Sequence, residues 1–253
     1  MDTRGKVVVV TGGAQGIGLE TAKMFASGGA RVAILDFNQE AMDKAVLEIG
    51  QGSIAVKANV ADEASVTAAF DAIVQKLGGV DVAVLNAGIL RDGLLLKVDK
   101  ETGKVKGKMT KDQWQAVIDV NLTGVFLTGR EAAARMIDGG RKGVLVLMSS
   151  IARHGNMGQS NYSAAKAGVH ALAVVWGREL SRYGIRVGSV SPGLIATPMV
   201  LKDMKPEALE KIRERIPIRR LGEPSEIAHA IRFVVENDLI TASNVEPSGG
   251  MAL

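Results

Sequence analysis

Short runs of β-branched and other apolar residues recur along the chain, separated by longer amphipathic segments. Continuous apolar runs of this length predict strands that are buried on both faces of a sheet. We expect six such strands, at Lys6–Thr11, Arg31–Leu35, Ser53–Ala58, Val80–Leu85, Gly143–Met148 and Ile185–Val190.

The segments between these runs carry apolar residues at helical spacing, which predicts helices. They span Leu19–Ser27, Ala41–Ile49, Ala64–Leu77, Lys111–Met136 and Ser163–Tyr183. Strand and helix therefore alternate from start to finish. This alternation favours an α/β fold: a single-domain, Rossmann-type, doubly wound parallel sheet with helices on both faces. Ligands are then expected at the carboxyl ends of the strands, where the strand order reverses.

One segment breaks this rhythm. Residues 97–108 are too polar for a core and predict an exposed insertion, a loop or small hairpin turning at Gly103. Its five lysines are either exposed to solvent or bind an acidic partner. Because the sequence contains no repeat and no linker, we expect one dinucleotide-binding and catalytic domain over residues 1–253. Within it, we expect the segment at about 197–217 to form a substrate lid.

Composition narrows the classes of function. The chain has 253 residues, 47% of them hydrophobic, 4% aromatic and 30 of them glycine, which suits one large aliphatic core. Its net charge is +4, but the basic residues are scattered without interleaved aromatic residues, so we expect no nucleic-acid partner. The absence of cysteine excludes disulfides, and no apolar run approaches the ~20 residues that span a bilayer. We expect a cytoplasmic protein without a membrane partner.

A glycine-rich turn follows the first predicted strand and precedes a predicted helix. Glycines permit tight turning and let backbone N–H groups approach a pyrophosphate at the positive end of the helix. The candidate cofactor-binding residues of this turn are Gly12, Gln15, Gly16, Ile17 and Gly18.

Asp36 ends the second predicted strand, eighteen positions beyond Gly18. A carboxylate there would accept hydrogen bonds from the adenosine ribose and repel a 2′-phosphate. Ala14 and Gln15 supply no counter-charge for that phosphate, so NAD(H) is expected in preference to NADP(H). The alternative is that Asp36 merely caps the following helix. The next two strand ends add Asn59 and Val60, then Asn86, Ala87 and Gly88, as further cofactor-binding candidates.

Tyr162 and Lys166 are four residues apart in a predicted helix, so their side chains share one face. A cation beside a phenol favours the phenolate and would bring the hydroxyl within range of general acid/base catalysis. Taken alone, this spacing is equally that of an ordinary surface pair.

Taken together, these motifs resemble the short-chain dehydrogenase/reductase family, in order and over nearly the whole chain. Within it, the chain is most similar to 3-oxoacyl-[acyl carrier protein] reductases and related 3-hydroxyacyl or hydroxysteroid dehydrogenases. The resemblance rests on Thr11–Gly18, Asn86–Gly88, Asn121, Ser149–Ser150, Tyr162 with Lys166, Ser191–Gly193, Gly158–Tyr162 and Arg220–Pro224.

The resemblance implies roles for matching residues, with no metal. Tyr162 is the general acid/base; Lys166 lowers its pKa and holds the nicotinamide ribose; Asn121 anchors a water of the proton relay. Asn121 could also be an ordinary buried polar residue at a helix kink. A serine polarises the carbonyl, and the spacing from Tyr162 indicates Ser149, whereas strand register favours Ser150. The carboxamide would be held by Pro192, Gly193, Ile195 and Thr197.

The expected activity is interconversion of a secondary alcohol and a ketone, with a 3-oxoacyl/3-hydroxyacyl thioester as first choice of substrate. Alternatives are a hydroxysteroid, a small diketone or diol, and a catalytically silent NAD-sensing regulatory protein. A sugar-nucleotide epimerase would need additional C-terminal residues. The resemblance also implies a homo-oligomer, a tetramer, with helices 111–136 and 163–183 at an isologous interface.

Overall fold

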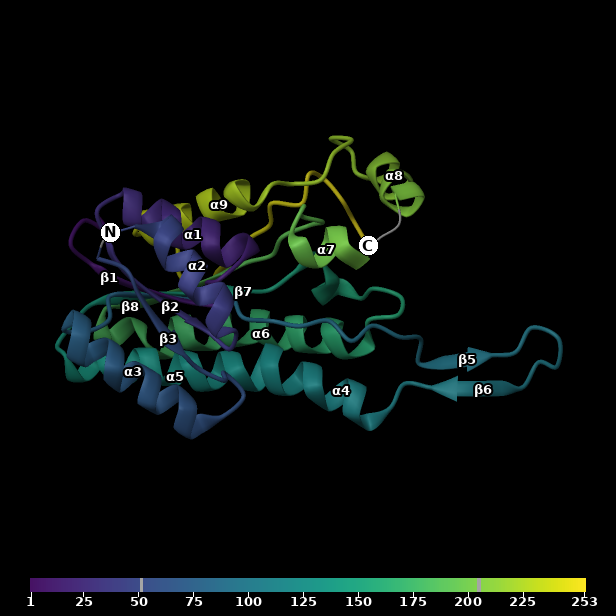
Figure 1. Ribbon diagram of the computed structural model, residues 1–253, viewed down its shortest axis with the longest axis horizontal. Helices are drawn as coiled ribbons and strands as arrows, with labels where there is room; N and C mark the ends of the chain where they lie inside the picture. The colour runs from purple at the N-terminus through teal and green to yellow at the C-terminus, as the bar shows by residue number, and fades with distance from the viewer. Residues whose placement is uncertain (51, 204–205) are drawn as a thin grey trace.

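The computed structural model describes residues 1–50, 52–203 and 206–253, in which strands and helices alternate along the chain (Figure 1). In this part of the chain seven strands form one parallel sheet, in the order β3-β2-β1-β4-β7-β8-β9. The parallel α/β architecture predicted from the sequence is confirmed. The strands are β1 (Val7–Thr11), β2 (Arg31–Asp36), β3 (Ile54–Lys57), β4 (Val82–Leu85), β7 (Gly143–Met148), β8 (Ile185–Val190) and β9 (Ser243–Val245).

The strand order reverses between β1 and β4. From β1 the chain moves outward through β2 to β3, and it then returns to place β4 on the other side of β1. Connections from two such neighbouring strands leave in opposite directions, which opens a crevice beyond their carboxyl ends. This crevice is where the fold positions a ligand.

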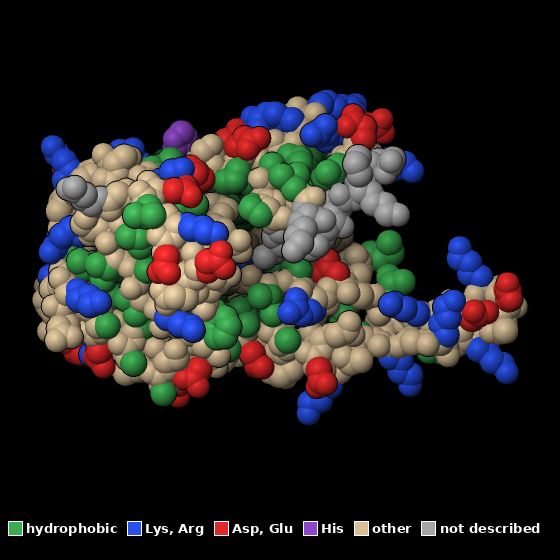
Figure 2. All heavy atoms as spheres, viewed as in Figure 1, with side chains coloured by type: hydrophobic (Ala, Val, Ile, Leu, Met, Phe, Trp, Pro, Cys, Tyr) green, Lys and Arg blue, Asp and Glu red, His purple; other side chains and the backbone are tan. Residues whose placement is uncertain are grey.

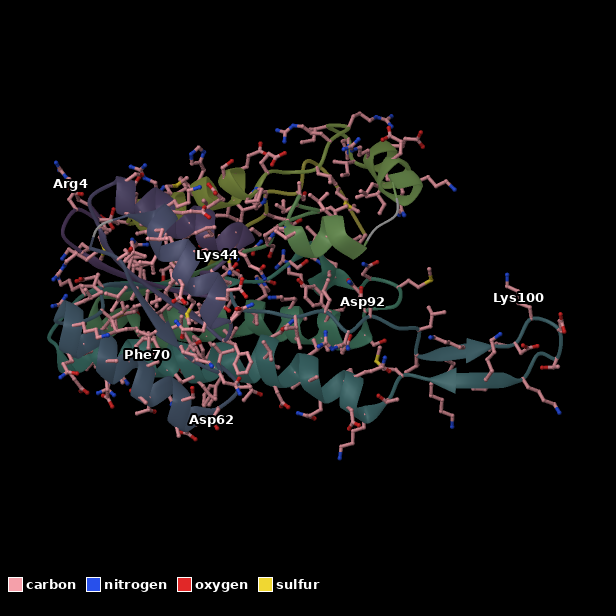
Figure 3. The ribbon with its side chains drawn as sticks, in the orientation of Figure 1. Arg4, Lys44, Asp62, Phe70, Asp92 and Lys100 are labelled. Atoms are coloured by element: carbon pink, nitrogen blue, oxygen red, sulfur yellow. The ribbon has the colours of Figure 1, made fainter. Side chains whose placement is uncertain are left out.

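Helices cover both faces of the sheet (Figure 1). Alternate residues of β1 point to opposite faces, so Val8 and Val10 join one hydrophobic cluster while Val7 and Val9 join the other. The first cluster contains Phe25 and is covered by α1 (Gly16–Ser27), α2 (Gln39–Ile49) and α9 (Pro224–Glu236). The second contains Phe70, labelled in Figure 3, and is covered by α3 (Glu63–Leu77), α5 (Gly124–Asp138) and α6 (Ser160–Glu179).

The helix predicted over residues 111–136 is confirmed, but the structure divides it into three parts that the sequence did not indicate. Helix α4 (Lys111–Ile118) passes into a π-helical turn, Asp119–Thr123, before α5 begins. Asn121 lies in this turn, fully buried, with its side-chain amide bonded to the backbone of Ile89. π-Helical turns inside α-helices occur frequently at functional sites.

Two other sequence expectations need correction. β3 was expected to be buried on both faces, but it is the edge strand of the sheet and three of its four residues are only partly buried. Strand β9 and helix α9 were not predicted. β9 has only three residues, too few for a periodic signal, and it pairs with β8 through tertiary contacts.

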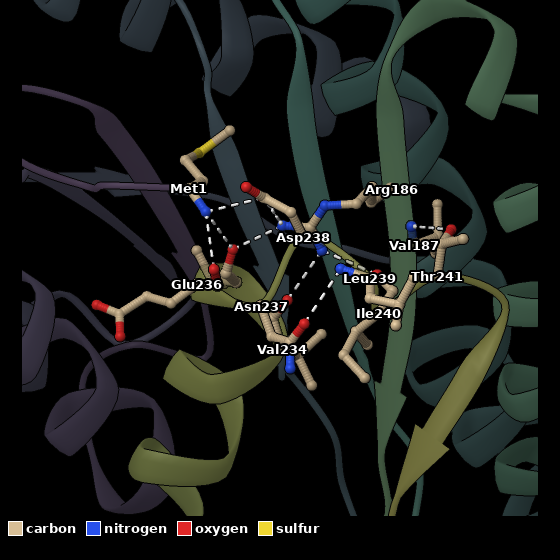
Figure 4. A network of polar contacts seen from close by, with 11 residues as sticks. Met1, Arg186, Val187, Val234, Glu236, Asn237, Asp238, Leu239, Ile240 and Thr241 are labelled. Carbon is tan, nitrogen blue, oxygen red and sulfur yellow. Dashed lines mark hydrogen bonds and ion pairs between the residues drawn. The ribbon is translucent and has the colours of Figure 1, made fainter.

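At the amino end of β8, Arg186 joins this strand to the end of α9 (Figure 4). Its guanidinium donates to the carbonyls of Val234 and Val235 at 3.0 and 2.7 Å, and the Met1 amino group donates to Glu236 O at 3.0 Å. Cations are favourable at a helix C-terminus because the last carbonyls lack intrahelical partners. This network fixes the C-terminal end of α9 near the amino end of β8, opposite the crevice.

Except for the 3-10 turn Ser181–Tyr183, which precedes β8 at the amino end of the sheet, the remaining elements follow the carboxyl ends of the strands. They are the β5 (Leu96–Val98) and β6 (Val105–Lys108) hairpin, the 3-10 turns Ile151–His154 and Ser181–Tyr183, α7 (Pro198–Asp203) and α8 (Pro206–Arg215). The lid expected at about 197–217 contains α7 and α8, whereas Met204 and Lys205 lie outside the described residues. Among the helices of residues 1–50, 52–203 and 206–253, none has the length and apolar character to cross a membrane.

Candidate active site

The glycine-rich turn joins β1 to α1 at the crevice. Gly12 and Gly16 have φ values of +62° and +54°, in the left-handed region that favours glycine. A Cβ atom on Gly18 would lie 2.1 Å from the carbonyl oxygen of Gly12, so any side chain there would displace the backbone. Gln15 immediately precedes α1, and Ile17 lies in its first turn.

The N-terminus of α1 is suited to an anion. No side chain from the described residues caps it, and the first turn carries no acidic residue. Its N–H groups therefore present the positive end of the helix dipole without internal compensation. Thr197, from the chain beyond β8, lies beside this end, since a Cβ on Gly16 would be 3.5 Å from Thr197 Cγ2. The glycine-rich turn and the N-terminus of α1 therefore form a site that fits the pyrophosphate of a dinucleotide.

Asp36 ends β2 and faces the same turn. Its carboxylate accepts hydrogen bonds from the backbone N–H groups of Ala14 at 3.3 Å and Asn38 at 3.2 Å. The N-cap of α2 is Asn38, whose side chain accepts from Ala41 N at 3.1 Å. Asp36 is therefore not the cap of that helix.

Asn59 and Val60 lie just beyond β3, next to the end of β2. The Asn59 side chain is exposed, and its Oδ1 accepts a hydrogen bond from Ala61 N at 3.1 Å. The Val60 side chain is buried and packs on α5, where a Cβ on Gly124 would be 2.9 Å from Val60 Cγ2. Only the backbone of Val60 is thus left to contact a ligand.

Hydrogen bonds of Asn86 and Thr11 connect the carboxyl ends of β1 and β4. Asn86 Nδ2 donates to the carbonyls of Thr11 and Gly12, each at 3.1 Å. Thr11 Oγ1 accepts in return from the N–H groups of Asn86 and Ala87. Gly88 follows, and a Cβ there would lie 3.4 Å from Asn121 Oδ1. Thr11 was not among the expected site residues, although its place at the end of β1 is a usable signal.

Ser149 and Ser150 follow β7 but have different surroundings. Ser149 is buried, and its hydroxyl donates to the backbone carbonyl of Lys166 at 2.8 Å. Ser150 is partly exposed; its Oγ accepts from Ala152 N at 3.1 Å, and its side chain is close enough to the Tyr162 phenol to lower the pKa of that group. The structure thus brings Ser150, not Ser149, to the phenol.

Burial controls the titration of Tyr162 and Lys166. It raises the pKa of Tyr162 to about 12, with the nearby Ser150 hydroxyl opposing the rise and the Asp92 charge adding to it. Burial also lowers the pKa of Lys166 to about 8. Lys166 Nζ donates to Met148 O at 2.7 Å and lies 5.5 Å from the centre of the Tyr162 ring. The sequence-based expectation of a lowered Tyr162 pKa is not met here, because burial disfavours the charged phenolate.

Asn121 faces the backbone beyond β4 from the π-helical turn. Its Oδ1 accepts from Ile89 N at 2.8 Å, and its Nδ2 donates to Ile89 O at 2.9 Å. The side chain therefore ties the Asn86–Gly88 segment to the turn between α4 and α5. Both amide atoms are engaged, so contact with a water would fall to the backbone of the turn.

The segment after β8 lies between the Ser150 turn and the C-terminal residues. Pro192 O accepts from Ile151 N at 3.1 Å, and Gly193 N donates to Pro247 O at 3.1 Å. Ile195 is buried, forms a bridge with Gly222, and accepts through its carbonyl from Thr197 N at 2.8 Å. The fold thereby brings residues 192–197 close to both Ser150 and the glycine-rich turn.

Asn161 is a further buried residue of the site that we did not single out from the sequence. Its Nδ2 donates to the carbonyls of Arg91 and Gln113, while its Oδ1 accepts from Tyr162 N at 2.8 Å. It therefore ties α6 to the segment after β4 and to α4. Over the residues that the structure describes, no group of three or more His, Asp or Glu side chains could hold a metal ion.

Comparisons with known proteins find relatives along the whole chain. Residues 12–252 match a family model described as enoyl-(acyl carrier protein) reductase. The chain is 38% identical over 259 residues to the 3-oxoacyl-[acyl-carrier-protein] reductase FabG of Thermotoga maritima, with 100% of both chains covered. It is 37% identical over 267 residues to the (3R)-3-hydroxyacyl-CoA dehydrogenase of Canis lupus familiaris, covering 98% of this chain and 96% of that protein.

A solved structure is similar over the same length. It is the crystal structure of 3-ketoacyl-(acyl-carrier-protein) reductase from Brucella melitensis in complex with NADH. The TM-score is 0.87 at 29% sequence identity, and the match covers 99% of this chain and 100% of that one.

Proposed function

This chain belongs to the short-chain dehydrogenase/reductase family, and from that premise we propose that it interconverts 3-oxoacyl and 3-hydroxyacyl thioesters with NAD(H). It is an oxidoreductase of that family. The observation that supports the proposal most strongly is the cluster of Tyr162, Ser150 and Lys166, next to a glycine-rich turn shaped for a pyrophosphate. Relatives over the whole chain reduce or oxidise acyl thioesters by name.

A nicotinamide dinucleotide would supply or accept the hydride when bound. Its pyrophosphate would rest on the uncapped N-terminus of α1, at Gly12, Gln15, Gly16, Ile17 and Gly18. Asn59, Val60 and the Asn86–Gly88 segment would line the adenosine end, and Pro192, Gly193, Ile195 and Thr197 would face the carboxamide.

The preference for NAD(H) over NADP(H) is part of this proposal and depends on Asp36. Its carboxylate lies within 3.3 Å of Ala14 N, at the edge of the turn. A 2′-phosphate near this position would face a negative charge in a confined space, whereas two ribose hydroxyls could donate to it.

Ser150 and Tyr162 act on the substrate oxygen. When a ketone is reduced, negative charge develops on this oxygen, and two hydroxyl donors aimed at it lower the barrier. A pKa of about 12 keeps the Tyr162 phenol protonated at neutral pH, which is the form that donates a proton. Reduction of the ketone uses this protonated phenol, whereas oxidation of the alcohol uses the phenolate.

Lys166 and Asn121 support this proton transfer. Lys166 is held by Met148 O with its ammonium near the phenol, and it would also reach the nicotinamide ribose. The π-helical turn at Asn121 interrupts the regular helical bonding between α4 and α5. We assign to its backbone the water through which the proton is replaced.

We also propose a homotetramer, with α4, α5 and α6 at the subunit interface. Large apolar side chains on these helices are exposed, among them Trp114, Phe126 and Val175. Burial of such side chains drives association. We further propose that the segment at about 197–217 acts as the substrate lid of a single domain. The cytoplasmic location stays a prediction from the sequence.

Turnover of NADH by the purified protein tests the activity. We expect oxidation of NADH with acetoacetyl-CoA or an oxoacyl carrier protein, and far slower oxidation with a 3-ketosteroid or a small diketone. Tyr162→Phe should lose at least about 100-fold in kcat while still binding NADH. A faster reaction with the steroid or diketone would contradict the substrate class. Binding of NADH without turnover of any ketone would instead support a regulatory sensor.

A further inference from the structure

The basic hairpin, residues 94–108, projects from the body of the molecule beside the candidate active site (Figures 1 and 2). It contains β5 and β6 and carries five lysines against Asp99 and Glu101, a net charge of +3. In the part of the chain that the structure describes, only Lys106 among these lysines forms an ion pair, with Asp99. Four ammonium groups, at Lys97, Lys100, Lys104 and Lys108, therefore remain available to a ligand.

The turn at the tip of the hairpin is held by hydrogen bonds within the hairpin. Asp99 Oδ1 accepts from the N–H groups of Glu101 and Thr102 and from the Thr102 hydroxyl, at 3.0 to 3.2 Å. These bonds, together with the one from Lys106, lower the pKa of Asp99. Gly103 has a φ of +64°, the left-handed conformation that the turn needs. The sequence therefore encodes a folded arm, although a two-stranded hairpin that contacts no body surface is only marginally stable.

The base of the hairpin is fixed to the start of α6, the helix that carries Tyr162. Gln159 Nε2 donates to Asp92 Oδ2 at 2.8 Å, and Gly93 N donates to Gly158 O at 2.8 Å. Figure 3 shows Asp92 at this base and Lys100 near the tip. The arm therefore starts next to the phenol and leads away from it.

The character of the exposed surface changes along the arm. Leu94, Leu95 and Leu96, near the base, are 45%, 65% and 48% exposed, and the lysines lie beyond them. Extended chain rises about 3.3 Å per residue, so Lys100 is separated from Gly93 by up to about 23 Å. A ligand that matches this arm has an apolar linker next to its reacting carbonyl and a compact polyanion at its far end.

We propose that the basic hairpin binds the phosphate-bearing end of a nucleotide-linked thioester, the chemistry of an acyl-coenzyme A. This rests on the proposed function, since the thioester carbonyl must reach Tyr162. Lysines bind phosphate as point charges, and several of them on one short arm match the several phosphate charges of one nucleotide. Exposed charges are screened by salt, so this contact weakens as ionic strength rises.

Two thioesters with the same reacting carbonyl test the proposal. Acetoacetyl-CoA carries the nucleotide, whereas acetoacetyl-N-acetylcysteamine has no phosphate. In the variant K97Q/K104Q/K108Q we expect KM for the CoA thioester to rise about tenfold with kcat unchanged. KM for the N-acetylcysteamine thioester should not change. High salt should raise the wild-type KM for the CoA thioester towards that of the variant.

The matched control is K44Q/K76Q/K142Q, which removes three exposed lysines that lie outside the hairpin and should leave both KM values unchanged. A variant that raises KM equally for both thioesters, or for neither, would overturn the proposal. So would an effect confined to an oxoacyl carrier protein, which would assign the arm to a protein partner.

Binding of free coenzyme A, measured by calorimetry at low ionic strength, separates this proposal from the proposed function. Weaker binding to K97Q/K104Q/K108Q than to the wild type and the control supports the arm even if no thioester is turned over. Equal binding to all three proteins contradicts it, whatever the activity. The melting temperature of each variant establishes that it is folded.

Discussion

The hydroxyl of Ser149 donates a hydrogen bond of 2.8 Å to the backbone carbonyl of Lys166, joining the end of β7 to the helix that carries Tyr162. The neighbouring Ser150 instead lies beside the phenol. Two adjacent serines thus separate a structural task from a chemical one. Strand alternation is the physical reason, because successive side chains leave the end of a strand in opposite directions.

Alanine at each serine should therefore have a different effect. Ser150→Ala removes a donor to the developing oxyanion, and kcat should fall by about 10²- to 10³-fold. Ser149→Ala removes a buried hydrogen bond, and the free energy of unfolding should fall by about 1 kcal/mol with most activity kept. Steady-state kinetics and urea denaturation of both variants measure this. Equal losses of kcat would mean that the two hydroxyls share the catalytic role.

Replacing Asp36 should change the cofactor preference. Asp36→Ser removes the carboxylate that would accept from the ribose, so kcat/KM with NADH should fall by about 10- to 100-fold. With NADPH it should rise, because the repulsion of the 2′-phosphate is gone. Kinetics with each cofactor test this, with Asp43→Ser on the exposed face of α2 as the control. If the NADH to NADPH ratio stays the same, the role of Asp36 is refuted.

Lys166 should make stability depend on pH in alkaline solution. Its pKa is about 8 in the folded protein against an ordinary value of 10.5, so between these values the unfolded chain binds more protons there. The free energy of unfolding contributed by this site therefore rises with pH, by about 2 kcal/mol up to pH 10. Above pH 10 the raised pKa of Tyr162 acts in the opposite direction, because the unfolded phenol ionises first.

The comparison that isolates this effect is Lys166→Met. The wild type should gain stability relative to this variant as the pH rises from 8 to 10, because the methionine does not titrate. Urea denaturation at several pH values gives both curves. Parallel curves would show that Lys166 keeps an ordinary pKa.

Gly18 and Gly16 offer a matched pair in the cofactor turn. Gly16→Ala meets no atom closer than 3.5 Å, so only the left-handed backbone opposes it, by about 1–2 kcal/mol. Gly18→Ala places a methyl group 2.1 Å from the Gly12 carbonyl and must shift the turn. We expect a larger loss of melting temperature and of NADH affinity for Gly18→Ala. The reverse order would mean that the turn is more compliant than its packing indicates.

Arg141 should matter for stability alone. It donates to the buried carboxylate of Asp81 at 2.8 Å, at the amino edge of the sheet, where Asp81 also accepts from Val7 N. Arg141→Met should lower the free energy of unfolding by about 1–3 kcal/mol, because the buried charge loses a partner. The kinetic constants should stay at wild-type values. A loss of kcat in the folded variant would reveal coupling across the sheet that we do not expect.

Most of the fold could be predicted because it depends on local patterns. Apolar runs marked β1, β2, β4, β7 and β8 to within two residues, since a strand buried on both faces needs continuous apolar side chains. The glycines of residues 12–18 marked the turn after β1, because only glycine combines such dihedral angles with such close packing. The order of the motifs along the chain was sufficient to indicate the family.

Other features depended on contacts between residues distant in the sequence, and only the tertiary structure decided them. The π-helical turn at Asn121 follows from its bonds to Ile89, and the partial exposure of β3 follows from its place at the sheet edge. The raised pKa of Tyr162 is of the same kind: the sequence put a cation four residues away, but the surrounding fold set the desolvation that dominates it. Local patterns fix which residues form each element, whereas burial and long-range hydrogen bonds arise only when the elements pack together.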